Sequence, residues 1–184
     1  RTVAETFGKP ESKWRNNTFV YRVHDEPNPE KLNKFMLLIS RLGYSMNLSN
    51  RTTLVNSYNK LFEDVEGKGE KNLIQTVALR TMAKAVYSTD NIGHYGLAFD
   101  YYTHFTSPIR RYPDLMVHRL IERYLIEGQS SVNKKEYEDM CAHSSEMEKQ
   151  AEEMERQSIK YKQAEYLQDK IGQVFEGLVS GVSK

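Results

Sequence analysis

The sequence has a single cysteine and no long apolar run, and each shortage excludes a class of protein. Because Cys141 is the only cysteine among 184 residues, an internal disulfide is impossible and a reducing compartment is expected. We expect Cys141 itself to be structural. No apolar stretch approaches the roughly 18 residues that a membrane-spanning helix needs, and residues 1–14 lack the apolar core of a signal peptide. The sequence therefore predicts a cytoplasmic protein without a membrane partner.

The chain also has no excess of positive or negative charge, and it lacks several common catalytic motifs. The 26 basic and 25 acidic residues give a net charge of +1, so the overall charge does not indicate a nucleic-acid partner, although it leaves room for a local basic patch. Residues 65–72 lack the spacing of a P-loop, and no nucleophile elbow is present. The spacing of His94, His104 and His118 matches no zinc site. Because His118 follows Asp114 by four residues, a structural contact between the two is favoured.

The pattern of apolar residues predicts a mainly helical α+β chain. At 39% hydrophobic and 28% charged residues, the composition is that of a folded globular protein. Asn28 is expected to cap a helix that Pro29 opens, and Asn133 with Glu136 predicts the capped start of a polar helix of about 35 residues. We expect that long helix to lean on a larger body along its thin apolar seam. The predicted helices are 1–7, 29–42, 48–61, 73–88, 113–127 and 133–167, and the predicted β segments are 18–23 and 171–184.

The segment TSPIRRYPD, residues 106–114, is the most informative stretch. Ser107 and Pro108 form a helix-start signature, whose backbone N–H groups suit a phosphate oxygen. Neighbouring helical residues diverge by about 100°, so Arg110 and Arg111 are not expected to reach one anion together. One arginine can bind the anion while the other pairs with an acid such as Asp114. From these residues alone, both a phosphate or RNA site and a purely structural turn remain open.

Three segments of the chain resemble one known family. GHYGLAFDYYTHFTSPIRRYPDLMVHR, residues 93–119, is similar to the signature of the catalytic (RNB) domain of the ribonuclease II/R family, and its RRYPD version resembles the ribonuclease R branch. YRVHDEPNPEKL, residues 21–32, resembles a second segment of that domain. IGQVFEGLVSGVS, residues 171–183, is similar to the opening of the OB-fold domain that follows in these enzymes.

The resemblance implies both an architecture and an activity. Residues 1–168 would be the C-terminal part of an RNB domain whose start is missing, and residues 169–184 would begin a truncated OB-fold. The family hydrolyses single-stranded RNA from its 3′ end to 5′-mononucleotides with the help of Mg²⁺. The sequence does not indicate an oligomeric state.

The resemblance also assigns roles to individual residues. The family's catalytic arginine falls on Arg110, which would contact the scissile phosphate and offset charge in the transition state. The residues expected to bind RNA or phosphate, or to brace the loop, are Thr106, Ser107, Arg111, Tyr112 and, on the long helix, Glu155.

The family's metal-binding aspartates have no counterpart here. Asp25, Asp64, Asp90 and Asp100 are scattered singly through the first hundred residues, so no metal ligand is expected in this chain. We therefore expect the parent protein to need Mg²⁺ and the isolated chain to be inactive. Two alternatives are a non-catalytic module that binds RNA or phosphate, and a helical scaffold without a ligand.

Overall fold

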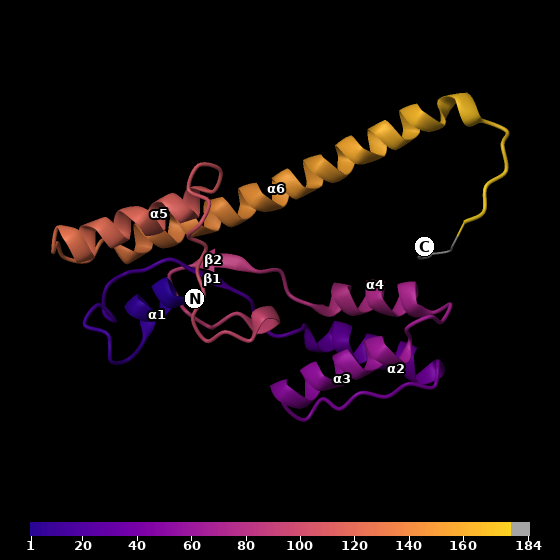
Figure 1. Ribbon diagram of the computed structural model, residues 1–184, viewed down its shortest axis with the longest axis horizontal. Helices are drawn as coiled ribbons and strands as arrows, with labels where there is room; N and C mark the ends of the chain where they lie inside the picture. The colour runs from indigo at the N-terminus through magenta and orange to yellow at the C-terminus, as the bar shows by residue number, and fades with distance from the viewer. Residues whose placement is uncertain (178–184) are drawn as a thin grey trace. The chain divides into compact units, whose positions relative to one another are not determined.

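The computed structural model describes residues 1–177, apart from the side chains of residues 51 and 52. The chain divides into two compact units, and each is described by itself (Figure 1). The signature unit consists of Arg1–Asp25 and Lys84–Gln173, and it contains every candidate site residue. The three-helix unit is built on Glu26–Ala83.

The signature unit combines helices with one small sheet. Its helices are α1 (Thr2–Gly8), the 3₁₀ turn η1 (Tyr95–Leu97), α5 (Tyr112–Ile121), the π-helical turn η2 (Glu122–Ile126), α6 (Lys134–Leu167) and the 3₁₀ turn η3 (Gln168–Lys170). Its strands are β1 (Tyr21–Val23) and β2 (Val86–Ser88), which pair antiparallel with Tyr21 opposite Ser88. The expected helix 1–7 and the second half of the expected strand 18–23 are thus confirmed.

β2 corrects the predicted helix over residues 73–88. The helix there, α4, ends at Thr81, and Val86–Ser88 is extended instead. The reason is tertiary, because the backbone of this segment pairs with β1 and the Tyr87 N–H donates to the Ser145 hydroxyl at 2.9 Å. β-branched and aromatic residues such as Val86 and Tyr87 suit a strand once a partner is present.

Aromatic side chains dominate the core of the signature unit. The rings of Phe7 and Phe19 stack with their centroids 4.4 Å apart, and Trp14 packs against Phe7 at 5.4 Å. Both phenylalanines are fully buried. The core joins α1, β1, β2, α5 and α6 through Ala4, Phe7, Phe19, Val20, Tyr21, Val23, Tyr87, Met116, Val117, Leu120, Tyr124 and Cys141.

α5 follows the predicted pattern until it changes to a π turn. Val117, Leu120 and Tyr124 are buried as the apolar stripe requires. Leu125, also predicted in that stripe, is 46% exposed, and this prediction is wrong. The Glu127 N–H donates to the carbonyl of Glu122, five residues back, at 3.0 Å. This wider turn changes the angular spacing of the side chains, so that Tyr124 stays in the core while Leu125 is exposed.

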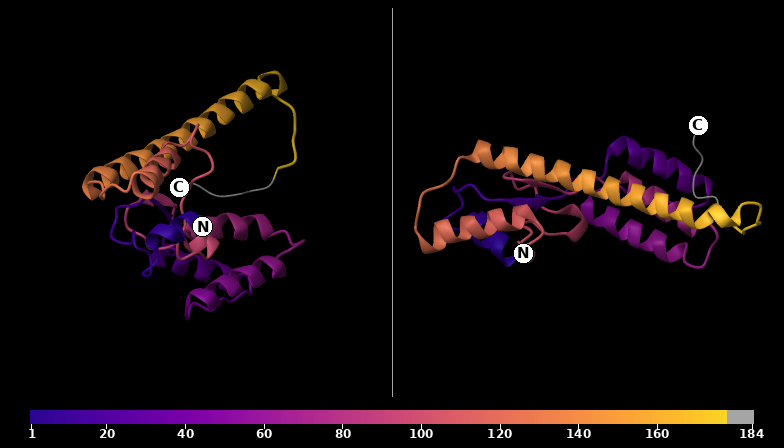
Figure 2. Two further views of the ribbon diagram at one scale, coloured as in Figure 1. Left: turned by 60° about the vertical axis from the view of Figure 1, so that its left-hand side comes forward. Right: turned by 90° about the horizontal axis from the view of Figure 1, so that it is seen from above.

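α6 has a packed half (residues 134–150) and an exposed half (residues 151–167). Asn133 caps the helix by accepting from the backbone N–H groups of Lys135 and Glu136, as predicted. The packed half lies against β2 and α5 and buries Cys141. From Ala151 to Leu167 every side chain of α6 is exposed, and the helix extends well beyond α5 (Figures 1 and 2). Within the described residues, the expectation that the whole helix leans on a larger body holds for the packed half alone.

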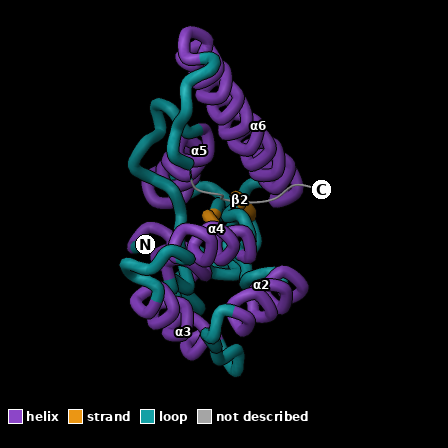
Figure 3. The backbone as a smooth tube through the Cα atoms, turned by 90° about the vertical axis from the view of Figure 1, so that its right-hand side faces the viewer, coloured by secondary structure: helices purple, strands orange, loops and turns teal. Residues whose placement is uncertain are grey.

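The three-helix unit contains α2 (Pro29–Arg41), α3 (Arg51–Asp64) and α4 (Lys71–Thr81), shown in Figure 3. Asn28 caps α2 by accepting from the Lys31 N–H at 3.1 Å, as predicted. The Phe35 ring of α2 stacks with the Tyr58 ring of α3 at 6.0 Å. The hydroxyls of Tyr58 and Thr81 lie 2.8 Å apart and link α3 to α4. The predicted helices 29–42 and 48–61 are confirmed with shifted ends.

The predicted β segment 171–184 is not observed where the structure describes it. Residues 171–177 form no strand, and residues 178–184, including Leu178, lie outside the described residues. The OB-fold therefore stays a prediction. None of the helices within residues 1–177 is long and apolar enough to cross a membrane.

Candidate functional site

The signature segment forms a tight turn in front of α5, which corrects the predicted helix start at Ser107. The Ser107 carbonyl accepts from the N–H groups of Arg110 at 3.3 Å and Arg111 at 3.0 Å, and α5 begins only at Tyr112. The Ser107 N–H donates to Asp114 Oδ2 at 2.8 Å. These three backbone N–H groups are thus used inside the turn and cannot form the expected phosphate cradle.

The two arginines of the turn have different partners. Arg111 Nη2 donates to Asp114 Oδ2 at 2.8 Å, which confirms the predicted pairing of one arginine with Asp114. The Asp114 side chain is completely buried. For the Arg110 guanidinium, the described part of the chain provides neither an ion pair nor a hydrogen bond, and this side chain is exposed. Arg110 is therefore the arginine that is free to bind an anion.

The predicted contact between Asp114 and His118 is wrong. His118 Nε2 lies 2.9 Å from the Phe105 carbonyl, and the His118 ring stacks on the Phe105 ring with centroids 4.3 Å apart. A carbonyl oxygen only accepts, so Nε2 carries the proton in this bond. His118 is thus a structural residue that fixes the segment preceding the turn.

A cleft of about 790 Å³ opens beside Arg110. Two arginines, two tyrosines, a histidine and two thioethers contribute to its wall, a mixture that suits a ligand with anionic and aromatic parts. The turn and the start of α5 supply Arg110, Arg111, Tyr112 and Pro113, β2 supplies Tyr87, and α6 supplies Met140, His143, Ser144, Met147, Glu148 and Ala151.

Sequence reasoning missed most of the α6 wall. His143 and Met147 were assigned no role, although they follow Met140 at intervals of three and four residues, the spacing of one helix face. That spacing was the available signal. The thin apolar seam predicted along α6 contains Ser144, Glu148 and Ala151 of this wall, but it did not indicate that the signature turn lies opposite them.

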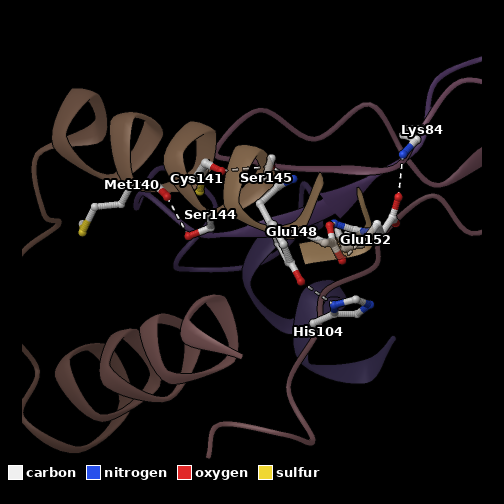
Figure 4. A network of polar contacts seen from close by, with 10 residues as sticks. Lys84, His104, Met140, Cys141, Ser144, Ser145, Glu148 and Glu152 are labelled. Atoms are coloured by element: carbon white, nitrogen blue, oxygen red, sulfur yellow. Dashed lines mark hydrogen bonds and ion pairs between the residues drawn. The ribbon is translucent and has the colours of Figure 1, made fainter. Parts of the chain in front are cut away.

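Behind the cleft, a polar network connects β1, β2 and α6 (Figure 4). Arg22 of β1 forms two hydrogen bonds with the Glu148 carboxylate, at 2.6 and 3.1 Å, and its guanidinium lies 4.5 Å from the centre of the Tyr87 ring. The Tyr87 hydroxyl lies 2.9 Å from His104 Nδ1. Glu148 of the cleft wall is therefore paired with Arg22 and not with Arg110.

Burial and the arginines hold this network in defined protonation states. Burial, helped by the charges of Arg111 and Arg22, lowers the pKa of His104 to about 4, so its ring is neutral at neutral pH. Burial also raises the pKa of Tyr87 to about 12. Burial raises the pKa of the Cys141 thiol to about 12, in keeping with the structural role expected of it.

The remaining candidate residues do not all meet in the cleft. Tyr112 lies in it, with its hydroxyl 3.6 Å from Met140 Sδ. Thr106 lines a separate hollow of about 340 Å³, which it shares with His104 and Arg111. Glu155 is exposed on α6, one turn beyond Ala151 at the end of the cleft. The structure thus brings together Arg110, Arg111 and Tyr112, and leaves Thr106 and Glu155 outside.

The donor set near the cleft does not suit a metal ion. Among residues 1–177, no group of three or more histidine, cysteine, aspartate or glutamate side chains is arranged to hold one. Glu148 of the cleft wall and Asp114 beneath the turn are each engaged with an arginine. Mg²⁺ requires several oxygen ligands around it, and the described residues do not provide them.

Comparison with known proteins identifies the family. The RNB domain profile matches residues 2–127, which include the turn, α5 and the sheet. The chain belongs to the RNB domain family. Among curated relatives, ribonuclease R of Aquifex aeolicus is 41% identical over 165 residues, covering 89% of this chain and 23% of the relative. Ribonuclease R of Thermotoga maritima is 37% identical over 192 residues, covering the whole chain and 26% of the relative.

Solved structures of RNB proteins share the fold. Mycoplasma genitalium RNase R in complex with ribose-methylated single-stranded RNA matches with a TM-score of 0.83 at 27% identity, covering 99% of this chain and 29% of that one. This chain therefore spans about a quarter of the length of its ribonuclease R relatives. Because a fold alone does not determine activity, function must be argued from the site.

Proposed function

We propose that the full-length protein is a 3′–5′ exoribonuclease that hydrolyses single-stranded RNA to 5′-mononucleotides, with Arg110 contacting the scissile phosphate. The observation that carries the proposal is the contrast within the turn, where Arg111 is held by Asp114 while Arg110 has no partner in the described residues and lines the cleft. Membership of the RNB family supports the reaction class. The RNase R relative that binds single-stranded RNA supports the substrate class.

The chemistry proposed for Arg110 is electrostatic. A guanidinium donates two parallel hydrogen bonds to phosphate oxygens, and these strengthen as negative charge develops during hydrolysis. Thr106, Ser107, Tyr112 and Glu155 remain proposed contacts to RNA or phosphate. Arg111 is placed to brace the turn, and its proposed contact to RNA would have to coexist with its bond to Asp114.

We assign the Mg²⁺ that the family implies to none of the described residues, and we derive no catalytic step through it. The proposal is that the longer protein binds this ion, that it works in the cytoplasm, and that the isolated 184-residue chain does not hydrolyse RNA. Hydrolysis of a 3′-tailed RNA by the isolated chain with Mg²⁺, abolished by Arg110→Ala, would contradict this part of the proposal.

The decisive experiment compares Arg110→Ala with Arg119→Ala in the full-length protein. Loss of a donor that stabilises transition-state charge typically lowers turnover by about 10²–10³-fold, and we expect this for Arg110→Ala in single-turnover hydrolysis of a 3′-tailed RNA. The melting temperature should not change, because the Arg110 side chain has no partner among the described residues. Arg119 is an exposed arginine of α5 outside the cleft and serves as the matched control.

The outcomes separate the proposal from its alternatives. Turnover within twofold of wild type for Arg110→Ala would contradict the assigned role. A drop of several degrees in melting temperature would instead indicate a structural arginine. Salt-dependent RNA binding without any turnover by the full-length protein would favour a non-catalytic RNA-binding module.

A further inference from the structure

One buried carboxylate fixes both ends of the turn that presents Arg110. Asp114 Oδ2 accepts from the Ser107 N–H at 2.8 Å and from Arg111 Nη2 at 2.8 Å. Ser107 and Arg111 are the first and last residues of that turn, which the bond from the Arg111 N–H to the Ser107 carbonyl also closes. A single oxygen atom of α5 therefore holds the backbone before Arg110, through Ser107, and the side chain of the residue after it, Arg111.

The carboxylate is itself firmly anchored. Asp114 lies in the first turn of α5, where the helix dipole favours a negative charge. The next turns of α5 bury Met116, Val117 and Leu120 in the core of the signature unit. The turn is thus tied to the rigid body of the unit rather than carried as a free surface loop, and Arg110 projects from it beside the cleft.

The hydrogen bonding of this pair is asymmetric. Asp114 Oδ1 and Arg111 Nε are both buried and have no hydrogen-bond partner within the described residues. An arginine and a carboxylate can form two parallel hydrogen bonds, yet this pair forms one and directs the same oxygen to Ser107. The same oxygen thus binds both the Arg111 guanidinium and the Ser107 N–H, which links the ion pair to the position of the turn.

We propose that Asp114 is a positioning residue for the hydrolysis of RNA, acting through the Ser107–Arg111 turn to hold Arg110 at the scissile phosphate. This inference rests on the proposed function. Because the Asp114 side chain is completely buried, we expect it to affect the reaction through the turn, and chiefly through Arg110. Small displacements of a catalytic group reduce turnover strongly, by about 10²-fold for 1 Å.

A double-mutant cycle in the full-length protein tests this dependence. The variants are Asp114→Asn, Arg110→Ala and the two combined, measured by single-turnover hydrolysis of a 3′-tailed single-stranded RNA and by RNA affinity. We expect Asp114→Asn to lower the rate constant by about 10²-fold with less than about a threefold change in affinity. In the Arg110→Ala background the same substitution should change the rate constant by less than about twofold, because nothing is left to position.

A second variant keeps the test decisive if Asp114→Asn does not fold. Arg111→Lys retains a charge for Asp114 but removes the planar guanidinium, and we expect a smaller loss that also disappears in the Arg110→Ala background. Asp90→Asn is the matched control, because Asp90 is exposed and pairs only with the surface residue Lys134 within the described structure. It should retain wild-type turnover.

The outcomes distinguish failure of this inference from failure of the proposed function. If Arg110→Ala lowers turnover as expected and Asp114→Asn lowers it by the same factor in both backgrounds, Asp114 acts independently of Arg110 and only the positioning role is overturned. If Arg110→Ala leaves turnover within twofold of wild type, the role of Arg110 in the proposed function is wrong, and the positioning role is overturned with it.

Discussion

The two halves of α6 are parts of one continuous helix, yet they depend on different interactions. The packed half is held by bonds that reach across the fold, from Glu138 to Thr89, from Ser145 to Tyr87 and from Glu148 to Arg22. In the exposed half, one surface ion pair, between Glu152 and Lys84, reaches another part of the chain, and the pairs beyond it join neighbours on the helix itself. Helix formation therefore follows from local sequence, whereas tertiary bonds decide which half builds the cleft.

The largest expected difference between the halves concerns two glutamates. Glu138 accepts from the Thr89 N–H at 2.6 Å and from the Ser88 hydroxyl at 3.0 Å, so Glu138→Ala should lower the free energy of unfolding by about 2–4 kcal/mol. Glu155→Ala in the exposed half should change it by less than about 0.5 kcal/mol. Urea unfolding of the 184-residue chain measures both. Equal losses would show that the halves do not differ in this way.

A smaller difference is expected between two ion pairs of α6. Glu148→Gln leaves the mostly buried Arg22 without a charged partner and should cost about 1–3 kcal/mol. Glu152→Gln breaks a pair with Lys84 in which both side chains are more than half exposed, and it should cost at most about 1 kcal/mol. The same urea titration compares them. A larger cost at Glu152 would mean that the boundary between the halves lies further along α6.

The last prediction is that stability depends on pH through His104, which belongs to the polar network against the packed half of α6. The pKa of His104 is about 4 in the folded chain against an ordinary value of 6.5. Between pH 4 and pH 6.5 the unfolded chain therefore binds more protons than the folded chain. Stability should therefore fall as the pH is lowered from 6.5 toward 4. His94, whose pKa burial also lowers to about 4, contributes in the same direction. Melting temperatures of wild type and His104→Gln between pH 4.5 and 7.5 measure the contribution of His104.

We expect a shallower pH dependence for His104→Gln than for wild type. His143→Gln is the control, because His143 is exposed on α6, and it should keep the wild-type slope. An unchanged slope in His104→Gln would show that His104 is not held neutral by its surroundings.

The sequence predicted features that depend on neighbouring residues better than features that depend on residues far away in the chain. The caps at Asn28 and Asn133 depend on residues within one turn and were predicted correctly. The strand Val86–Ser88 depends on pairing with β1, more than 60 residues earlier in the chain, and the local pattern continued a helix instead. A strand that short gains its stability from its partner, so propensity alone could not reveal it.

The candidate site shows the same limit. The sequence predicted that one arginine would bind an anion and the other an acid, and the resemblance to RNB domains singled out Arg110. The prediction that this acid would be Asp114 is confirmed, and the arginine that pairs with it is Arg111. The bond from the Ser107 N–H to Asp114 depends on the conformation of the turn between them, which the sequence pattern did not predict. The wall that α6 contributes depends on the packing of segments that are distant in the sequence.

The π turn at Glu122–Ile126 has a consequence for how relatives of this chain are aligned. A π turn accommodates one residue more than an α-helical turn would, so it is the expected trace of a single-residue insertion at the end of α5. A relative without that residue would continue as a plain α-helix and need a one-residue gap there. We expect an alignment with its gap at this turn to keep the position of Tyr124 in the core.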